Sequence, residues 1–442
     1  LFNTPKLNFA PRFGIAYRLN NKTVIRAGFG VFFAFVGQQA GDKVKQSGFS
    51  STTPFQASQD GGLTFVTRLD NPFPNGIVAP TGAGGGLNTF LGNSITFFPQ
   101  HPATPYSQRW SMNIQRQLPG AFMAEVGYLG NRGTHLSSSS GSGVTMDYRP
   151  FNPDYLSRSP VRDQATINYW TAMLPNPFYP LLPNTGRSSS VIARNSLTQM
   201  ANFPQFTGVT SLDNVGISWY HALVARLERR FSAGYTVQVG YTFSKYMQAM
   251  SRLNGQLSPL EHVISNQDRR HHFTASGIYE LPFGPKKKLM ADTGPVLGRI
   301  VGGWQVEAIG IFQSGQPLGF GNALLVATLA DIPTGGRDPL LWFNVNAFNR
   351  RTADQLSYNY RTVSSLFSGV RGDGRKFLNA SLIKAVPIRE RLNGQLRAEF
   401  FNVLNHPNFG GPNVSPTSAA FGRVTSMTGT ARILQLALRI GW

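Results

Sequence analysis

The chain alternates apolar and polar residues with a period of two over many short segments. The clearest segment is 235–246, in which, from 235 to 244, the odd positions are apolar or aromatic and the even positions are small or polar. Because successive side chains of a β-strand point to opposite faces, this pattern predicts a strand with one apolar and one polar face. A second alternating segment, 219–231, precedes it, and the short Gly-containing connection FSAGY between them predicts a β-hairpin.

The same alternation recurs along the whole chain, which predicts an all-β fold. Each alternating segment is close to the roughly 9 to 11 residues that a tilted strand needs to cross a bilayer. We expect about eleven strands, at 13–19, 23–33, 108–118, 122–128, 219–231, 235–246, 272–281, 304–313, 377–386, 395–404 and 432–442.

The connections between these segments are alternately short and long. The short ones are 20–22, 119–120, 232–234 and 387–394, and the long ones are 34–105, 131–218 and 314–376. Such alternation is typical of an outer-membrane barrel with short periplasmic turns and long extracellular loops. A soluble β-sandwich has turn signals roughly every 8 to 12 residues, without this asymmetry. The connection 282–303, with three consecutive lysines, is of intermediate length and falls on the short-turn side.

The last strand carries the strongest membrane signal. One of its faces is entirely apolar and ends on an aromatic residue, so we interpret it as the lipid-facing strand for barrel insertion: Leu434, Leu436, Leu438, Ile440 and Trp442. The last strand of a soluble β-domain would alternate as well, but the loop asymmetry favours the membrane interpretation. The predicted fold is a transmembrane antiparallel β-barrel, of which residues 1–442 form a C-terminal segment.

The parity of the strands leads to a further expectation. If the last strand ends in the periplasm, counting back through eleven antiparallel strands makes the first strand run in the same direction. Bacterial outer-membrane barrels have an even number of strands. The chain also opens with no initiator Met, no basic region and no apolar region of a signal peptide. We therefore expect at least one further strand and a signal peptide upstream.

Composition excludes several function classes. The 442 residues contain 41 Lys and Arg against 20 Asp and Glu, a formal charge of +21, and no Cys. Without Cys there is no disulfide, zinc–thiolate site or cysteine nucleophile. The basic residues are spread along the chain and match no nucleic-acid-binding fingerprint, so nucleic acid is not expected as a partner. We expect outer-membrane lipid instead, with Arg at the barrel rims paired with lipopolysaccharide phosphates.

The sequence contains no pattern typical of an enzyme or of a cofactor site. The run Asp268, Arg269, Arg270, His271 and His272 suggests a metal, but adjacent His residues of a strand point to opposite faces and cannot both bind one ion. Neither a Gly-x-Ser-x-Gly nucleophile elbow nor a phosphate-binding loop is present. We therefore predict no catalytic residue, no metal and no cofactor.

Five strings in fixed order suggest a family. They are YSQRWSMNIQRQLPGAFMAEVGYLGNRGTHL (106–136), SWYHALVARLERRFSAGYTVQVGYTFSKYM (218–247), DRRHHFTASGIYELPFGPKKK (268–288), GGWQVEAIGIFQSGQPL (302–318) and RAEFFNVLNHPNF (397–409). Together they resemble the C-terminal barrel of Oar-like TonB-dependent outer-membrane transporters, and the resemblance spans nearly the whole chain.

This resemblance implies a barrel of 22 strands, of which this chain supplies about half, with a lumen closed by an N-terminal plug domain. Neither the plug nor its TonB-contacting segment is expected within residues 1–442. In such transporters the solute binds the extracellular loops and the plug, and the TonB complex then opens the plug. The solute class stays open between a carbohydrate, a peptide and a metal chelate.

Charged residues gather on the face that the barrel interpretation places toward the lumen. We expect ion pairs that rigidify the wall and dock the plug, or else contacts with the solute. The residues are Arg26, Glu125, Arg226, Glu228, Arg230, Glu307, Arg397 and Glu399.

The long loops contain many aromatic and amide side chains, as in 175–190 and 338–350. These residues are suited to stacking on sugars or binding peptides, but packing between loops that cover the barrel is the favoured explanation. The rival interpretation of the whole chain is a secreted or surface β-rich adhesion or structural protein. In a sandwich of that kind the apolar faces of the strands would meet in a closed core.

Overall fold

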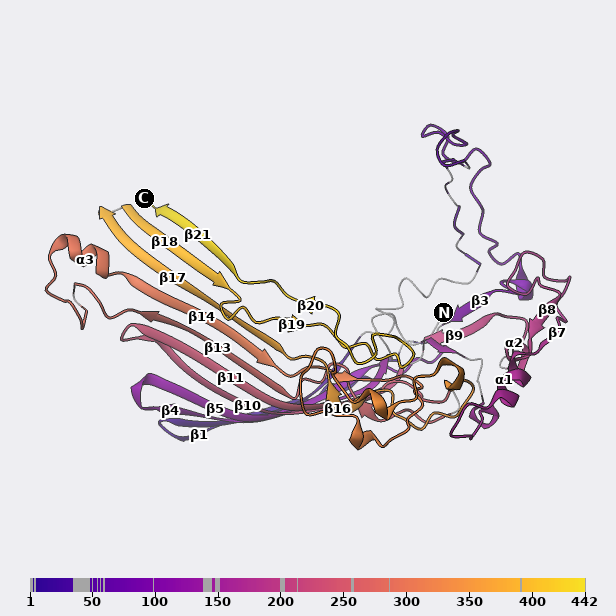
Figure 1. Ribbon diagram of the computed structural model, residues 1–442, viewed down its shortest axis with the longest axis horizontal. Coiled ribbons are helices and arrows are strands. Elements are labelled where there is room, and N and C mark those ends of the chain that lie inside the picture. The colour runs from indigo at the N-terminus through magenta and orange to yellow at the C-terminus, as the bar shows by residue number, and fades with distance from the viewer. Residues whose placement is uncertain are drawn as a thin grey trace.

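The computed structural model describes the chain except for residues 1–2, 4, 35–47, 50, 54, 56, 59, 98, 138–144, 148–151, 199–202, 213, 256–257, 286, 390–391 and 442. One large antiparallel sheet organises the fold, and it lies beside a layer of long loops (Figure 1). Among the described residues, none of the helices has the length and apolar character to cross a membrane.

The sheet has twelve strands, eleven of them in line and β12 (Val263–Ile264) paired beside β11. In order across the sheet these are β1 (Arg12–Asn20), β2 (Thr23–Phe33), β4 (Tyr106–Leu118), β5 (Phe122–Ser137), β10 (Asn214–Ser232), β11 (Tyr235–Ala249), β13 (His271–Glu280), β14 (Trp304–Gln313), β17 (Arg375–Arg389), β18 (Leu392–Phe401) and β21 (Ile433–Gly441). The prediction of an all-β antiparallel architecture is confirmed, and each expected segment overlaps one of these strands.

Several boundaries differ from the expected ones; β18, for example, ends at Phe401 and not at Leu404, and β11 continues to Ala249. Pairing between β5 and β10 continues beyond Gly133, so both strands extend into the expected loop 131–218. The hairpin of β17 and β18 stays paired from Pro387 through Arg389, which shortens the expected turn 387–394. In both places backbone hydrogen bonding continues past the end of the alternating pattern, a signal that apolar periodicity does not contain.

The remaining elements are short. Besides α3 (Pro295–Val301) and the 3-10 turn Pro119–Ala121, they lie in the long connections: β3 (Ser94–Phe97), β6 (Thr145–Asp147), β9 (Gly208–Leu212), β7 (Met173–Pro175), β8 (Val191–Ala193), β15 (Pro317–Leu318), β16 (Phe367–Arg371), β19 (Asn408–Phe409), β20 (Met427–Thr428), α1 (Gln164–Thr171), α2 (Arg194–Thr198) and the 3-10 turns Gly86–Asn88, Pro153–Tyr155, Leu329–Asp331, Val345–Ala347 and Thr352–Asp354.

The two ends of the sheet differ. At one end, here called the turn end, adjacent strands are joined by short links and by the segment that contains α3, and the C-terminus lies there too (Figure 1). At the other, the loop end, the long connections gather into an irregular layer (Figure 1). The predicted alternation of short and long connections thus becomes a separation in space.

The register joins the apolar residues of successive strands into continuous rows. The row through Leu436 of β21 passes through Leu382 and Tyr279 and reaches Tyr235. We call this side of the sheet the apolar face and the opposite side the polar face. At the edges the apolar face is open: Phe13, Ile15, Tyr17 and Leu19 are 56 to 71 % exposed, and Leu434, Leu436, Leu438 and Ile440 are 50 to 74 % exposed.

An apolar face this open is not the face of a sandwich. In a sandwich these side chains would contact a second sheet and be buried, at about 1.5 to 3 kcal/mol for each large side chain. Lipid supplies the same apolar surroundings without a second sheet. Four of the five residues predicted to face lipid in the last strand lie on this face, and Trp442 lies outside the described residues.

The edges of the sheet cannot close on each other as an antiparallel pair. Among the described residues β1 pairs only with β2, and β21 pairs only with β18. With eleven antiparallel strands in line, the two edge strands run in the same direction. Because unpaired backbone groups are costly in hydrocarbon, an open edge in a membrane requires further strands.

A compact apolar core lies in the loop layer. It is formed by the connection from β14 to β17 together with the connection from β18 to β21, and its buried members are Leu318, Phe320, Ala323, Ile332, Trp342, Phe343, Ala347, Phe348, Val370 and Phe421. The ring centroids of Phe343 and Phe421 are 5.1 Å apart. Loop packing, the favoured explanation for the aromatics of 338–350, thus holds for Trp342, Phe343 and Phe348.

We predict that Phe343→Ala destabilises the loop layer by about 3 to 5 kcal/mol, because the fully buried ring would leave a cavity. The measurement is the protease resistance of 314–374 against denaturant. Leu340→Ala, a 70 % exposed position of the same connection, is the control and should change stability by no more than about 0.5 kcal/mol. Equal effects of the two substitutions would contradict a packed loop core.

Candidate functional site

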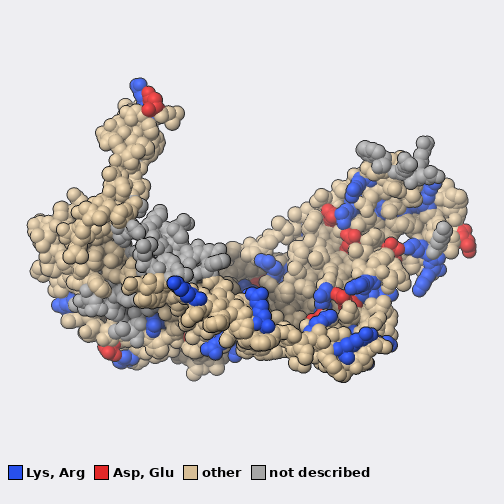
Figure 2. All heavy atoms as spheres, turned by 180° about the vertical axis from the view of Figure 1, so that it is seen from behind, with Lys and Arg blue, Asp and Glu red and all other residues tan. Residues whose placement is uncertain are grey.

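The register places all eight predicted charged residues on the polar face, where they form two groups. The first charge cluster consists of Arg26, Glu125, Arg226, Glu228 and Arg230 on β2, β5 and β10. The second charge cluster consists of Glu307, Arg397 and Glu399 on β14 and β18. Figure 2 shows Lys and Arg beside Asp and Glu over the strand half of the molecule.

The first charge cluster is connected through a glutamine. Arg26 donates to Gln115 Oε1, and Gln115 Nε2 donates to Glu125 Oε2 at 2.7 Å. Arg226 Nη2 lies 2.7 Å from Glu228 Oε2 on the same strand. Arg26, Glu228 and Arg230 also line one open hollow of the polar face. With three cations and two anions, this cluster carries an excess of positive charge.

The second charge cluster is centred on one guanidinium. Arg397 Nη2 lies 2.9 Å from Glu307 Oε2, and its Nε lies 3.2 Å from Glu399 Oε1. Glu307 and Glu399 are both register partners of Ser381 on the intervening strand β17. The small serine leaves room for Arg397 to reach across that strand. With one cation and two anions, this cluster carries an excess of negative charge.

These ion pairs contribute little to stability. The side chains of Arg226 and Arg397 are 46 % and 38 % exposed, and solvent-screened pairs of this kind contribute about 0 to 1 kcal/mol each. The ion pairs also do not link neighbouring strands. Arg226–Glu228 and Arg397–Glu399 each join residues of one strand, and Arg397–Glu307 joins β18 to β14 across the intervening strand β17. The ion pairs therefore contribute little to holding adjacent strands together.

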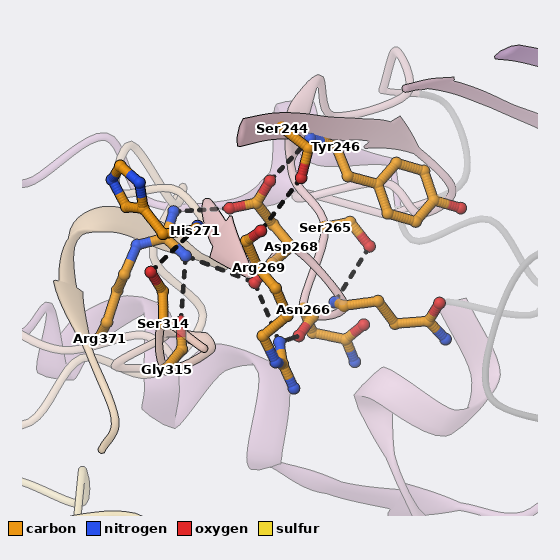
Figure 3. A network of polar contacts seen from close by, with 11 residues as sticks. Ser244, Tyr246, Ser265, Asn266, Asp268, Arg269, His271, Ser314, Gly315 and Arg371 are labelled. Atoms are coloured by element: carbon orange, nitrogen blue, oxygen red, sulfur yellow. Dashed lines mark hydrogen bonds and ion pairs between the residues drawn. The ribbon is translucent and has the colours of Figure 1, made fainter. Parts of the chain in front are cut away.

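A buried ion pair anchors the loop layer to the sheet (Figure 3). The Asp268 carboxylate is 1 % exposed, accepts a hydrogen bond from the Tyr246 backbone N–H at 2.7 Å, and lies 2.7 Å from Arg371 Nη2. Arg371 also donates to the carbonyl of Gly315 at 3.1 Å. Asp268 was considered above only as part of a candidate metal cluster. Its partner lies 103 residues away, so no local sequence signal predicts the pair.

The polar hollow at the mouth of the polar face lies beside this ion pair. Its lining includes Arg269, Gln313, Asp373, Arg375 and Asn408. Burial, and next the positive charge of Arg371, lowers the pKa of Arg269. The negative charge of Asp268 acts in the opposite direction on this pKa, and Asp373 adds a carboxylate to the lining, so cations and anions lie side by side at the hollow.

His271 and His272 lie on opposite faces of β13, as the strand geometry predicts. His271 is on the apolar face, where its Nδ1 is 2.8 Å from Tyr241 Oη, while His272 is the register partner of Thr242 on the polar face. No group of three or more metal-binding side chains occurs within the described part of the chain.

Aromatic side chains border the apolar face at both ends. Toward the loop end Trp110 lies over Gly130, where a Cβ would be 2.2 Å from its ring, and in the middle part of β5 Tyr128 Oη is 2.6 Å from His221 Nδ1. Near the turn end the rings of Tyr235 and Tyr279 are 6.5 Å apart. Two aromatic belts around an apolar band are typical of a transmembrane barrel.

The model of the family described as outer membrane beta barrel domain matches residues 1–435. The chain belongs to this family. The prediction of a location in the bacterial outer membrane is thereby confirmed. A search of curated proteins finds no match.

Several solved outer-membrane proteins are similar at low identity. The transporter YddB from Escherichia coli is 11 % identical with a TM-score of 0.49, over 98 % of this chain and 40 % of YddB. The FrpB iron transporter from Neisseria meningitidis is 11 % identical with a TM-score of 0.39, over 98 % of this chain and 39 % of FrpB. The siderophore receptor PirA from Acinetobacter baumannii is 11 % identical with a TM-score of 0.40, over 98 % of this chain and 40 % of PirA. The chain therefore spans well under half the length of each.

We predict that Asp268→Ala frees the strand pair β15–β16 from the large sheet, because it leaves the guanidinium of Arg371 without its buried carboxylate. Removing one partner of a buried pair costs about 3 to 5 kcal/mol. The measurement is amide hydrogen exchange of β16, which should become faster than in the parent protein. Asp292→Ala, at an exposed position of the turn end, is the control and should leave β16 unchanged. Unchanged exchange in Asp268→Ala would rule out the anchor.

Proposed function

We propose that the chain forms about half of the barrel wall of an Oar-like TonB-dependent transporter, which imports a large or scarce solute with energy relayed by TonB. The observation that carries the proposal is the sheet with eleven strands in line, which has an exposed apolar face and charge clusters on the opposite face. The wall itself does no covalent chemistry. Its role is to hold a polar lumen open within the membrane and to contact what moves through it.

The open edges support a larger barrel. Further strands of the same protein would pair with β1 and β21 and complete an even-stranded barrel, for which the resemblance described above implies 22 strands. A barrel of that size has a lumen wide enough to need a plug. The polar face of this sheet would then form one side of the lumen.

The charge clusters support contact with a movable plug. Their excess charges have opposite signs and lie on separate strands, so a complementary surface would dock in one orientation. Individual contacts that are partly solvated, as these are, can be broken without a large barrier. A plug must dock in a defined orientation and must also be released, since it seals the lumen at rest and moves during import.

The mouth hollow supports contact with a solute. Arg269 and Arg375 there suit a solute with carboxylate or phosphate groups, and the exposed ring of Tyr179 in the loop layer suits stacking on a sugar or a planar chelate. Acidic carbohydrates, peptides and metal chelates all meet this description.

Deletion genetics tests the function. We expect that a bacterium lacking this gene fails to grow on one class of scarce solute, screened from oligosaccharides, peptides and metal chelates, and that deletion of tonB abolishes growth on the same solute. The measurement is growth rate with that solute as the limiting nutrient. Normal growth of the tonB deletion on a solute that requires this gene would exclude energy transfer through TonB.

A matched pair of substitutions tests the clusters. Arg397→Gln removes the centre of the second charge cluster, and because a charge-assisted hydrogen bond contributes about 1.5 to 3 kcal/mol, we expect uptake to change by about tenfold. Arg439→Gln, on the same face of the adjacent strand β21, belongs to neither cluster and should leave uptake unchanged. The measurement is uptake of the solute found by the growth screen at equal protein level in the outer membrane. Equal uptake by both variants would contradict a role for the cluster.

A further inference from the structure

The connection from β13 to β14 differs from the other links at the turn end. Residues 281–303 fold into a closed unit, since the Leu281 N–H donates to the Trp304 carbonyl at 2.9 Å. Gly284 has a φ of +104° and lies so close to Gly302 that a Cβ would be 2.6 Å from the Gly302 Cα. The unit contains the helix α3, whose Gly298 packs against Pro285. This connection is therefore a packed, folded unit and not a simple turn.

Two side chains of the lipid-facing wall hold the C-terminal end of α3. Trp304 Nε1 donates to the Ile300 carbonyl at 3.0 Å, and Lys384 Nζ donates to the Arg299 carbonyl at 2.6 Å and to the carbonyl of Gly302. Trp304 and Lys384 are register partners in the row that continues to Leu396 and Leu438, both exposed on the apolar face. A cation is favourable at a helix C-terminus, where the last carbonyls lack partners within the helix.

This attachment fixes where α3 lies. Because both side chains that hold it belong to the apolar face, α3 sits at the lipid-facing rim and not under the lumen. Figure 1 shows it beyond the turn ends of β14 and β17. The rim of a lipid-facing wall is the level at which lipid headgroups meet the protein.

The outer surface of α3 is apolar. Val296, Leu297 and Ile300 are 76 %, 47 % and 60 % exposed, and helical periodicity places them on one side, with the buried Gly298 on the other. Leu289 and Met290, in the loop before the helix, are also exposed. The cations Lys288 and Arg299 lie exposed in the same unit, while Lys287 pairs with Glu280 at 2.7 Å.

We propose that α3 is an interfacial membrane anchor that binds the periplasmic leaflet of the outer membrane. Val296, Leu297 and Ile300 enter the boundary between headgroups and acyl chains, and Lys288 and Arg299 contact the phosphates of anionic phospholipid. Two observations indicate that lipid is what binds the apolar surface of α3. The apolar surface of α3 continues the lipid-facing wall through Trp304, and its cations complement anionic headgroups. The proposal rests on the outer-membrane location of the domain.

The absence of Cys allows a direct test. Ile300→Cys gives one labelling site for an environment-sensitive fluorophore in the protein reconstituted into phospholipid vesicles. We expect emission at shorter wavelength than in Leu340→Cys, which lies in the loop layer, and quenching by lipids with a nitroxide near the headgroup. Emission and quenching equal to those of Leu340→Cys would overturn the proposal. A shift of the emission to shorter wavelength without quenching by lipid would overturn it too, because the probe would then be buried by protein.

A second control separates this proposal from the function on which it rests. A probe at Leu436→Cys, on the lipid-facing wall, should be quenched by nitroxides deep in the acyl chains. Quenching at Leu436 without quenching at Ile300 would overturn the anchor and leave the barrel intact, whereas loss of both would contradict the membrane location itself.

The contribution of Lys288 and Arg299 to lipid binding is measured separately. Quenching at Ile300 should be stronger in vesicles that contain anionic phospholipid than in zwitterionic ones, and Lys288→Gln combined with Arg299→Gln should remove that difference. A difference that persists in the double variant would overturn the phosphate contacts.

Discussion

Backbone hydrogen bonding in hydrocarbon is the constraint on which the rest of this structure depends. In a bilayer each strand must satisfy its backbone polar groups through its neighbours, so the eleven strands in line form one continuous antiparallel sheet. The same requirement explains why the edge strands β1 and β21 need further partners, and why irregular backbone gathers beyond the ends of the strands. The alternation of side chains then separates an apolar face from a polar face.

The hydrophobic effect acts in different places on the two halves of the molecule. In the sheet, large apolar side chains lie exposed on the apolar face, and the polar face carries Thr236, Ser276 and Ser381 beside the charge clusters. In the loop layer, which lies in water, apolar side chains turn inward and form the cluster around Phe343. The Asp268–Arg371 pair joins the two halves, because a buried charge must be paired and its partner comes from the opposite segment. The loop layer is therefore attached to the wall at a defined point, next to the mouth hollow.

The features with a proposed function lie on the surfaces and at the ends of the sheet. The charge clusters lie on the polar face, the mouth hollow lies at the loop end, and α3 lies at the turn end. The positions of the strands were predictable because each alternating segment is a local signal. The pairing of Arg397 with both glutamates was not, because it requires the small Ser381 between them, nor was the place of α3, because Lys384 lies on another strand far along the chain.

The sequence by itself determined the all-β class, the two faces of each strand, the asymmetry of the connections and the membrane as surroundings, because a period of two is read within one segment. The predicted charged residues were placed on one face for the same reason. Only the tertiary structure decided how those charges divide into two clusters of opposite excess, which aromatics are buried in the loop layer, and that α3 rests on the lipid-facing wall. These features depend on contacts between residues distant in the chain, and the register of the sheet, which no local pattern specifies, brings those residues together.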